Sequence, residues 1–139
     1  MAHHSLGFWL TSSALAGALA VGTVTASAQD PRTILDRVYS VPQAERGQAL
    51  FAKHCISCHA QTEFAEPRFS ATFEGQTLGD VYGFISTSMP EGNAGSLKPD
   101  EYAAVIAYFL RMGGFPVGAD DMPADKAVLA TIGIVSNPK

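Results

Sequence analysis

The sequence is poor in cysteine, in basic residues and in strand-like alternation, and these shortages exclude several classes of protein. Only two of the 139 residues are cysteines, and they stand three positions apart. A framework of disulfides closes long loops, so these two cannot provide one. Nine basic residues against 13 acidic ones give a net charge of −4, which excludes a basic nucleic-acid binder. With 47% hydrophobic residues, the chain is not a disordered tail either.

Charged residues are also missing from the first 29 positions. The stretch from Leu6 to Val24 is rich in Ala, Leu, Val and Gly, and Ala26-Ser27-Ala28 has the small-x-small form that a signal peptidase accepts. These features predict a signal peptide at residues 1–28, cleaved on export, and one domain at residues 29–139. A retained membrane anchor is the alternative, because the apolar stretch is nearly long enough to span a bilayer.

Helical spacing of apolar residues recurs along the remaining chain, and no strand pattern of any length is present. Helices are predicted at about residues 42–53, from Thr77 until Pro90 ends the helix, and at residues 98–112. Gly47 lies inside the first of them, where glycine costs about 1 kcal/mol relative to alanine. It therefore indicates that another segment approaches the backbone closely. The predicted fold class is all-α.

Three segments have weaker patterns. Residues 30–40 suggest a turn or two of helix, and residues 60–75 suggest a loop packed by its own side chains. Residues 123–139 form a weakly patterned tail with one turn of helix near Ala127.

The clearest chemical signal is the pentapeptide Cys55-Ile56-Ser57-Cys58-His59, which has the Cys-x-x-Cys-His form of a c-type haem attachment site. Two thiols one helical turn apart can reach two vinyl groups on neighbouring pyrrole rings. The histidine that follows directly can then bind the iron through its imidazole. The motif predicts one covalently bound haem c, with Cys55 and Cys58 as the attachment residues and His59 as an iron ligand.

Three other uses of these residues compete with haem attachment. A thioredoxin-like redox pair needs a βαβ context, of which the sequence shows no sign. A structural zinc site needs four ligands, and Cys55, Cys58, His59 and the adjacent His54 could supply them only if neighbouring side chains wrapped one ion. A plain disulfide would leave the histidine without a role.

From about Ala44 to Gly118 the chain resembles class I cytochromes c, the mono-haem family of bacterial periplasmic type. The resemblance implies a cytochrome c fold of three to four core helices around the haem, with a core at about residues 41–118 and a C-terminal extension at 119–139. In that family a glycine and an aromatic residue of the first helix cross the last helix closely. Here Gly47 and Phe51 would meet Val105 and Tyr108.

A carrier of electrons needs a second axial ligand on the iron, and no histidine follows His59. Met89-Pro90 resembles the ligand loop of the family, because proline stops the helix and lets the thioether turn inward. Met89 is therefore the expected ligand, and Met112, Met122 and His54 are its rivals. Ligation by His and Met raises the potential relative to two imidazoles and leaves no open position for a substrate, which argues against an enzyme.

The resemblance also implies a surrounding shell. Pro67 is the expected carbonyl acceptor for the second ring nitrogen of the histidine, and Arg68 is a candidate partner for a haem propionate. The expected apolar walls of the crevice are Phe69, Phe73, Tyr82, Phe84, Ile85 and Leu97.

Several stretches resemble a narrower group, the periplasmic cytochromes that accept electrons from quinoprotein alcohol or sugar dehydrogenases. These stretches are Phe73–Leu78, Ser88–Gly92, Ser96–Leu97 and Gly114–Gly118. The resemblance implies a periplasmic electron carrier with a dehydrogenase as donor and an oxidase or another cytochrome as acceptor. The acidic charge predicts no binding to nucleic acid, and none to membranes after signal cleavage.

Two functions of other classes stay open. If Met89 does not bind the iron, the protein is a haem sensor or a peroxidase-like enzyme. Alternatively, the chain is a haem subunit held in a larger oxidoreductase, and the segment Leu6–Val24 could anchor it there.

Overall fold

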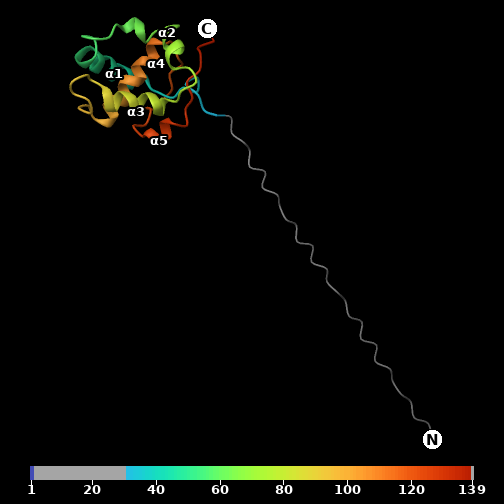
Figure 1. Ribbon diagram of the computed structural model, residues 1–139. Coiled ribbons are helices and arrows are strands. Elements are labelled where there is room, and N and C mark those ends of the chain that lie inside the picture. Colours follow the sequence, from blue (N-terminus) through green and yellow to red (C-terminus); the bar gives the residue numbers. More distant parts are fainter. Residues whose placement is uncertain (2–30, 139) are drawn as a thin grey trace.

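A computed structural model describes Met1 and residues 31–138 of the chain, so the expected signal peptide lies almost entirely outside the described residues. Residues 31–138 form helices and isolated β-bridges without a strand, as the sequence predicted (Figure 1). The elements are α1 Val41–His54, η1 Gln61–Glu63 (a 3₁₀ helix), α2 Arg68–Phe73, α3 Leu78–Ser88, α4 Pro99–Met112 and α5 Lys126–Leu129. None of the helices in this part of the chain is long and apolar enough to cross a membrane.

The three helices predicted from apolar spacing are present with nearly the expected ends. Ser40 caps α1, and its hydroxyl accepts a hydrogen bond of 3.1 Å from the Gln43 amide. Thr77 and Asp80 form a reciprocal capping box at the start of α3, with N–H to side-chain distances of 2.8 and 3.1 Å. Such caps satisfy amide groups that the first helical turn leaves without partners, and so they fix where each helix begins.

Helices α1 and α4 share the most extensive contact between helices, and Gly47 lies at their crossing. A Cβ added to Gly47 would lie 1.8 Å from the carbonyl oxygen of Ala104 and 3.0 Å from the Cβ of Tyr108. The close approach inferred from this glycine is therefore confirmed. The rings of Phe51 and Tyr108 lie 5.7 Å apart, as expected, whereas Ala104 rather than Val105 lies against Gly47.

The expectation of a loop at residues 60–75 is wrong in part, because η1 and α2 occupy this segment. Phe69 in α2 is buried, and its ring lies 5.1 Å from that of Phe73 and 5.5 Å from that of Phe115. A helix of six residues is too short to show an apolar period, so only its tertiary contacts reveal it.

The two ends of the described chain also differ from expectation. Residues 31–40 contain no helix; their backbone pairs with the C-terminal segment through the amide of Ile34 and the carbonyl of Gly133, at 3.0 Å. The tail is part of the core, since Leu129, Ile132 and Ile134 are almost completely buried. The expected turn of helix near Ala127 is α5, which packs on α3.

Candidate functional site

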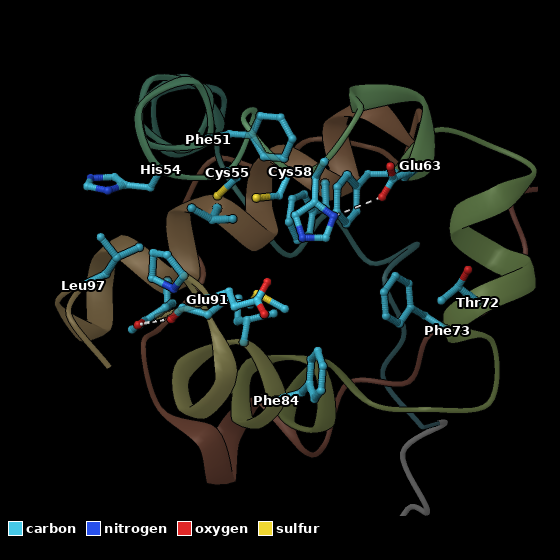
Figure 2. Close-up of a pocket in the computed structure, with 18 of the residues that line it drawn as sticks. Phe51, His54, Cys55, Cys58, Glu63, Thr72, Phe73, Phe84, Glu91 and Leu97 are labelled. Atoms are coloured by element: carbon cyan, nitrogen blue, oxygen red, sulfur yellow. Dashed lines mark hydrogen bonds and ion pairs between the residues drawn. The ribbon is translucent and has the colours of Figure 1, made fainter. Parts of the chain in front are cut away.

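A cavity of about 810 Å³ opens where the C-terminal ends of α1 and α3 lie near α4. Pockets of this size hold small ligands and cofactors. Figure 2 shows Cys55 and Cys58 on one side of the cavity and Phe84 on the opposite side, with Phe73 and Leu97 toward its two ends. The apolar and aromatic residues of the wall are Phe51, Phe64, Ala71, Phe73, Phe84, Ile85, Met89, Pro90, Leu97, Tyr102, Val105 and Phe109.

The two cysteines lie on a turn that continues α1. Cys55 caps the helix, and its carbonyl accepts hydrogen bonds of 3.1 Å from the Cys58 amide and 3.0 Å from the His59 amide. Both thiols are free and line the cavity. Cys55 is half-buried, and burial raises the pKa of its thiol, whereas Cys58 is exposed.

His59 follows on the same turn and is held by Glu63. Its Nδ1 lies 3.1 Å from Oε2 of Glu63, which leaves Nε2 for a ligand. The other oxygen of Glu63 accepts a hydrogen bond of 3.0 Å from the Ala60 amide. The hydrogen bond with His59, and next the one from Ala60, hold the pKa of Glu63 below its usual value.

Met89 reaches the cavity from the end of α3. It is the C-cap residue, and its amide still donates to the carbonyl of Ile85 at 2.9 Å. The Tyr102 hydroxyl of α4 donates a hydrogen bond of 2.8 Å to the Met89 carbonyl. Met89 therefore has its backbone fixed from two helices and is half-buried in the cavity wall.

The rival methionines lie elsewhere. Met122 is 2% exposed, and its amide and carbonyl each form a 2.8 Å hydrogen bond with the side chain of Gln43. Met112 packs against the core from the last turn of α4. Neither of them lines the cavity, whereas Met89 and His54 do.

Of the other residues expected at the site, Arg68, Ile85 and Leu97 line the cavity. Tyr82 does not: it is buried next to Tyr102, with ring centroids 6.4 Å apart. Phe69 is also absent from the cavity wall, because it belongs to the core beneath α2.

Pro67 is absent from the cavity wall too, and the structure does not place its carbonyl with His59. The carbonyl instead accepts a hydrogen bond of 3.1 Å from the Ala71 amide in the first turn of α2. Because α2 begins directly after Pro67, this carbonyl belongs to the helix, and Nδ1 of His59 pairs with Glu63.

Sequence reasoning missed Glu63 and Phe64. Glu63 stands four residues after His59, a helical spacing that η1 makes effective, but the segment was expected to be a loop. The Phe64 ring stacks on Phe109 at 3.9 Å with an interplanar angle of 4°. Only the tertiary structure brings these two rings together.

Two of the alternatives for the cysteines lack support in residues 31–138. No three residues among His, Cys, Asp and Glu are placed there to hold a metal ion, as structural zinc would require. The described chain also has no βαβ unit to carry a thioredoxin-like pair.

The comparison with protein families agrees with this geometry. Residues 42–109 match the family model of cytochrome C oxidase, cbb3-type, subunit III. This segment is thus a cytochrome c domain, and the all-α cytochrome c fold expected from the sequence is confirmed. Neither the curated proteins nor the solved structures that were compared with the chain gave a match.

A cytochrome c domain indicates a c-type cytochrome, with haem c, electron transfer and redox partner proteins as its general attributes. The residues of the cavity fit this group. Two free thiols one turn apart suit covalent attachment, and an imidazole whose Nδ1 is engaged presents Nε2 as a ligand. A thioether is available at Met89, and the walls are mostly apolar.

Proposed function

We propose that the protein is a periplasmic mono-haem cytochrome c of class I that carries one electron at a time between redox partners. Cys55 and Cys58 hold the haem covalently, and His59 and Met89 bind its iron. The observation that carries this proposal is that one cavity is lined by all four residues, which come from the ends of two different helices. Haem c, when bound, supplies a one-electron iron couple.

The chain's own residues suit it to carry electrons rather than to transform a substrate. His59 and Met89 would both bind the haem iron, which would leave no ligand position for a substrate. The aromatic and aliphatic side chains of the wall would give the haem a mostly apolar environment, which favours a high potential together with thioether ligation. Arg68 lines the cavity at an exposed position, where its guanidinium can pair with a propionate.

The expected partners follow from charge and exposed apolar surface. The net charge of −4 favours partners with a basic or neutral face, and Phe84 is 59% exposed at the cavity. A small, transient contact of this kind suits a quinoprotein dehydrogenase as donor and an oxidase or another cytochrome as acceptor.

Optical spectra of protein matured in a periplasm that attaches haem c test the proposal. We expect an alkaline pyridine spectrum with one haem c per chain, and a Met–iron charge-transfer band in the oxidised protein. Mass analysis that finds two unmodified thiols and no added tetrapyrrole would overturn covalent attachment. Carbon monoxide binding to the reduced protein at neutral pH would instead indicate an open sixth position.

A second candidate function is that of a haem subunit in a larger oxidoreductase. The observation that favours it is the family match, since that model describes a subunit of an oxidase. The first candidate predicts a free protein whose N-terminus is at residue 29. The second predicts co-purification with other subunits and an N-terminus that retains the segment Leu6–Val24.

A further inference from the structure

The hydrogen bond between His59 and Glu63 involves a full carboxylate instead of a backbone carbonyl. Nδ1 of His59 lies 3.1 Å from Oε2 of Glu63, which Figure 2 marks by the dashed line at the Glu63 carboxylate. Both residues line the cavity, and their side chains are 34% and 42% exposed. The pair therefore lies at the cavity wall, where one partner is the expected iron ligand.

The carboxylate of Glu63 has a fixed orientation. Its Oε1 accepts a hydrogen bond of 3.0 Å from the Ala60 amide at the start of η1. Because this bond holds one oxygen, Oε2 is directed at the imidazole without free rotation of the side chain. The same 3₁₀ turn thus sets both the backbone after His59 and the acceptor for its ring.

A carboxylate affects a ligated imidazole more strongly than a neutral acceptor does. A hydrogen bond to an ionised acceptor is roughly twice as strong as one between neutral groups. Ligating histidines that donate to a carboxylate become more basic ligands. A more basic imidazole gives more electron density to the iron, which stabilises the ferric state relative to the ferrous state.

We infer that Glu63 is a positioning residue that orients His59 and, through its negative charge, lowers the midpoint potential of the protein. The inference rests on the proposed function, because it requires His59 to bind the haem iron. The thioether of Met89 raises the potential and the carboxylate of Glu63 lowers it, so the value is set by these two opposed contributions.

The test compares the midpoint potentials of haem-loaded wild type, Glu63→Gln and Glu66→Gln. Glu66→Gln is the matched control, because it removes one negative charge from the same segment. The Glu66 carboxylate accepts a hydrogen bond of 2.5 Å from the Ser70 hydroxyl and not from His59. We expect Glu63→Gln to favour the ferrous form about tenfold more than Glu66→Gln does, a shift of about +59 mV for one electron. Equal shifts in the two variants, or no shift, would overturn the inference.

A second readout is independent of the potential. We expect ¹⁵N NMR of the reduced, haem-loaded protein to show a protonated Nδ1 of His59 whose resonance moves in Glu63→Gln and not in Glu66→Gln. An unchanged Nδ1 resonance would overturn the inference, as would loss of the Met–iron band in Glu63→Gln. If Glu63→Gln fails to take up haem, Glu63→Asp, with its shorter reach, must show a shift of the same sign.

Failure of this inference and failure of the proposed function give different results. A wild type with one covalent haem and a Met–iron band, but with no effect of Glu63→Gln, overturns only the role of Glu63. A wild type that attaches no haem overturns the proposed function itself.

Discussion

Tyr102 and Met89 are joined by a hydrogen bond of 2.8 Å, in which the hydroxyl on α4 donates to the carbonyl of the residue that ends α3. This bond ties the expected ligand to the helix that crosses α1. Because α1 leads directly into the cysteines and His59, the packing of α1 on α4 holds both sides of the cavity.

Tyr102→Phe is expected to weaken ligation by Met89. A net hydrogen bond contributes about 1 kcal/mol, so added imidazole should displace the methionine at roughly fivefold lower concentration. The measurement is an imidazole titration followed at the Met–iron band. Tyr82→Phe is the matched control, because the Tyr82 hydroxyl forms only a long contact of 3.5 Å with the Pro99 carbonyl. Equal imidazole affinity in wild type and Tyr102→Phe would contradict the role given to this bond.

The two methionines that precede proline are expected to behave differently. Met89→Leu should abolish the Met–iron band, because leucine has no thioether. Met122→Leu should keep the band, since Met122 is buried in the core and does not line the cavity. It should cost less than about 1.5 kcal/mol, as volume-conserving swaps usually do. A band that disappears only in Met122→Leu would show that the ligand is misassigned.

Gly47→Ala tests the crossing of α1 and α4. Helix propensity alone would stabilise the variant by about 1 kcal/mol. The new Cβ, however, would meet the Ala104 carbonyl at 1.8 Å, so we expect a net destabilisation of at least about 2 kcal/mol in denaturant unfolding. Gln48→Ala, at the exposed neighbouring position, is the control and should not destabilise. Stabilisation by Gly47→Ala would refute the close crossing.

The buried hydroxyl of Tyr39 leads us to expect that the folded protein loses stability at alkaline pH. Its hydroxyl donates to the Phe115 carbonyl at 2.8 Å, and burial raises the pKa of Tyr39 to about 12 although Arg111 opposes the shift. Between pH 10 and 12 the unfolded state loses this proton and the folded state keeps it. The stability that protonated Tyr39 contributes is therefore intact below pH 10. As the pH rises from 10 to 12, the free energy of unfolding falls by about 1 kcal/mol per pH unit.

The variant Tyr39→Phe isolates this contribution. It should be about 1 kcal/mol less stable than wild type at pH 7, where the hydrogen bond is lost, and should lose less stability between pH 10 and 12. The measurement is denaturant unfolding at a series of pH values. Parallel stability profiles of the two proteins across this range would contradict the assignment.

The C-terminal segment is expected to be structural. Ile132 is fully buried, so Ile132→Ala should destabilise the protein by about 2–5 kcal/mol in thermal or denaturant unfolding. Val128→Ala is the control, because Val128 is 40% exposed on the same segment. Similar small effects of both substitutions would show that the segment does not contribute to the core.

Local signals predicted the parts of the fold that depend on neighbouring residues. Apolar spacing gave the three long helices, and the Thr77 cap and the Pro90 stop gave the ends of α3. The unfavourable helix propensity of a glycine inside a predicted helix indicated the crossing at Gly47. Each of these signals arises within a few turns of chain, so the sequence carries it directly.

The parts that were missed depend on contacts between distant segments. Residues 132–134 look weakly patterned, yet they are ordered by backbone pairing with residues 32–34 and 76–78. Glu63 meets His59 only because η1 forms, and the Pro67 carbonyl bonds α2 instead of His59 because α2 begins directly after this residue. A lone sequence does not reveal pairings of this kind, since their free energy comes from tertiary packing.

Gly133 forms bridges both with Thr33 and with Thr77. Because the first bridge is parallel and the second antiparallel, residues 132–134 lie between residues 32–34 and the start of α3. The C-terminal segment thus ties the residues that precede α1 to the helix that carries Met89, and truncation before residue 132 would release both.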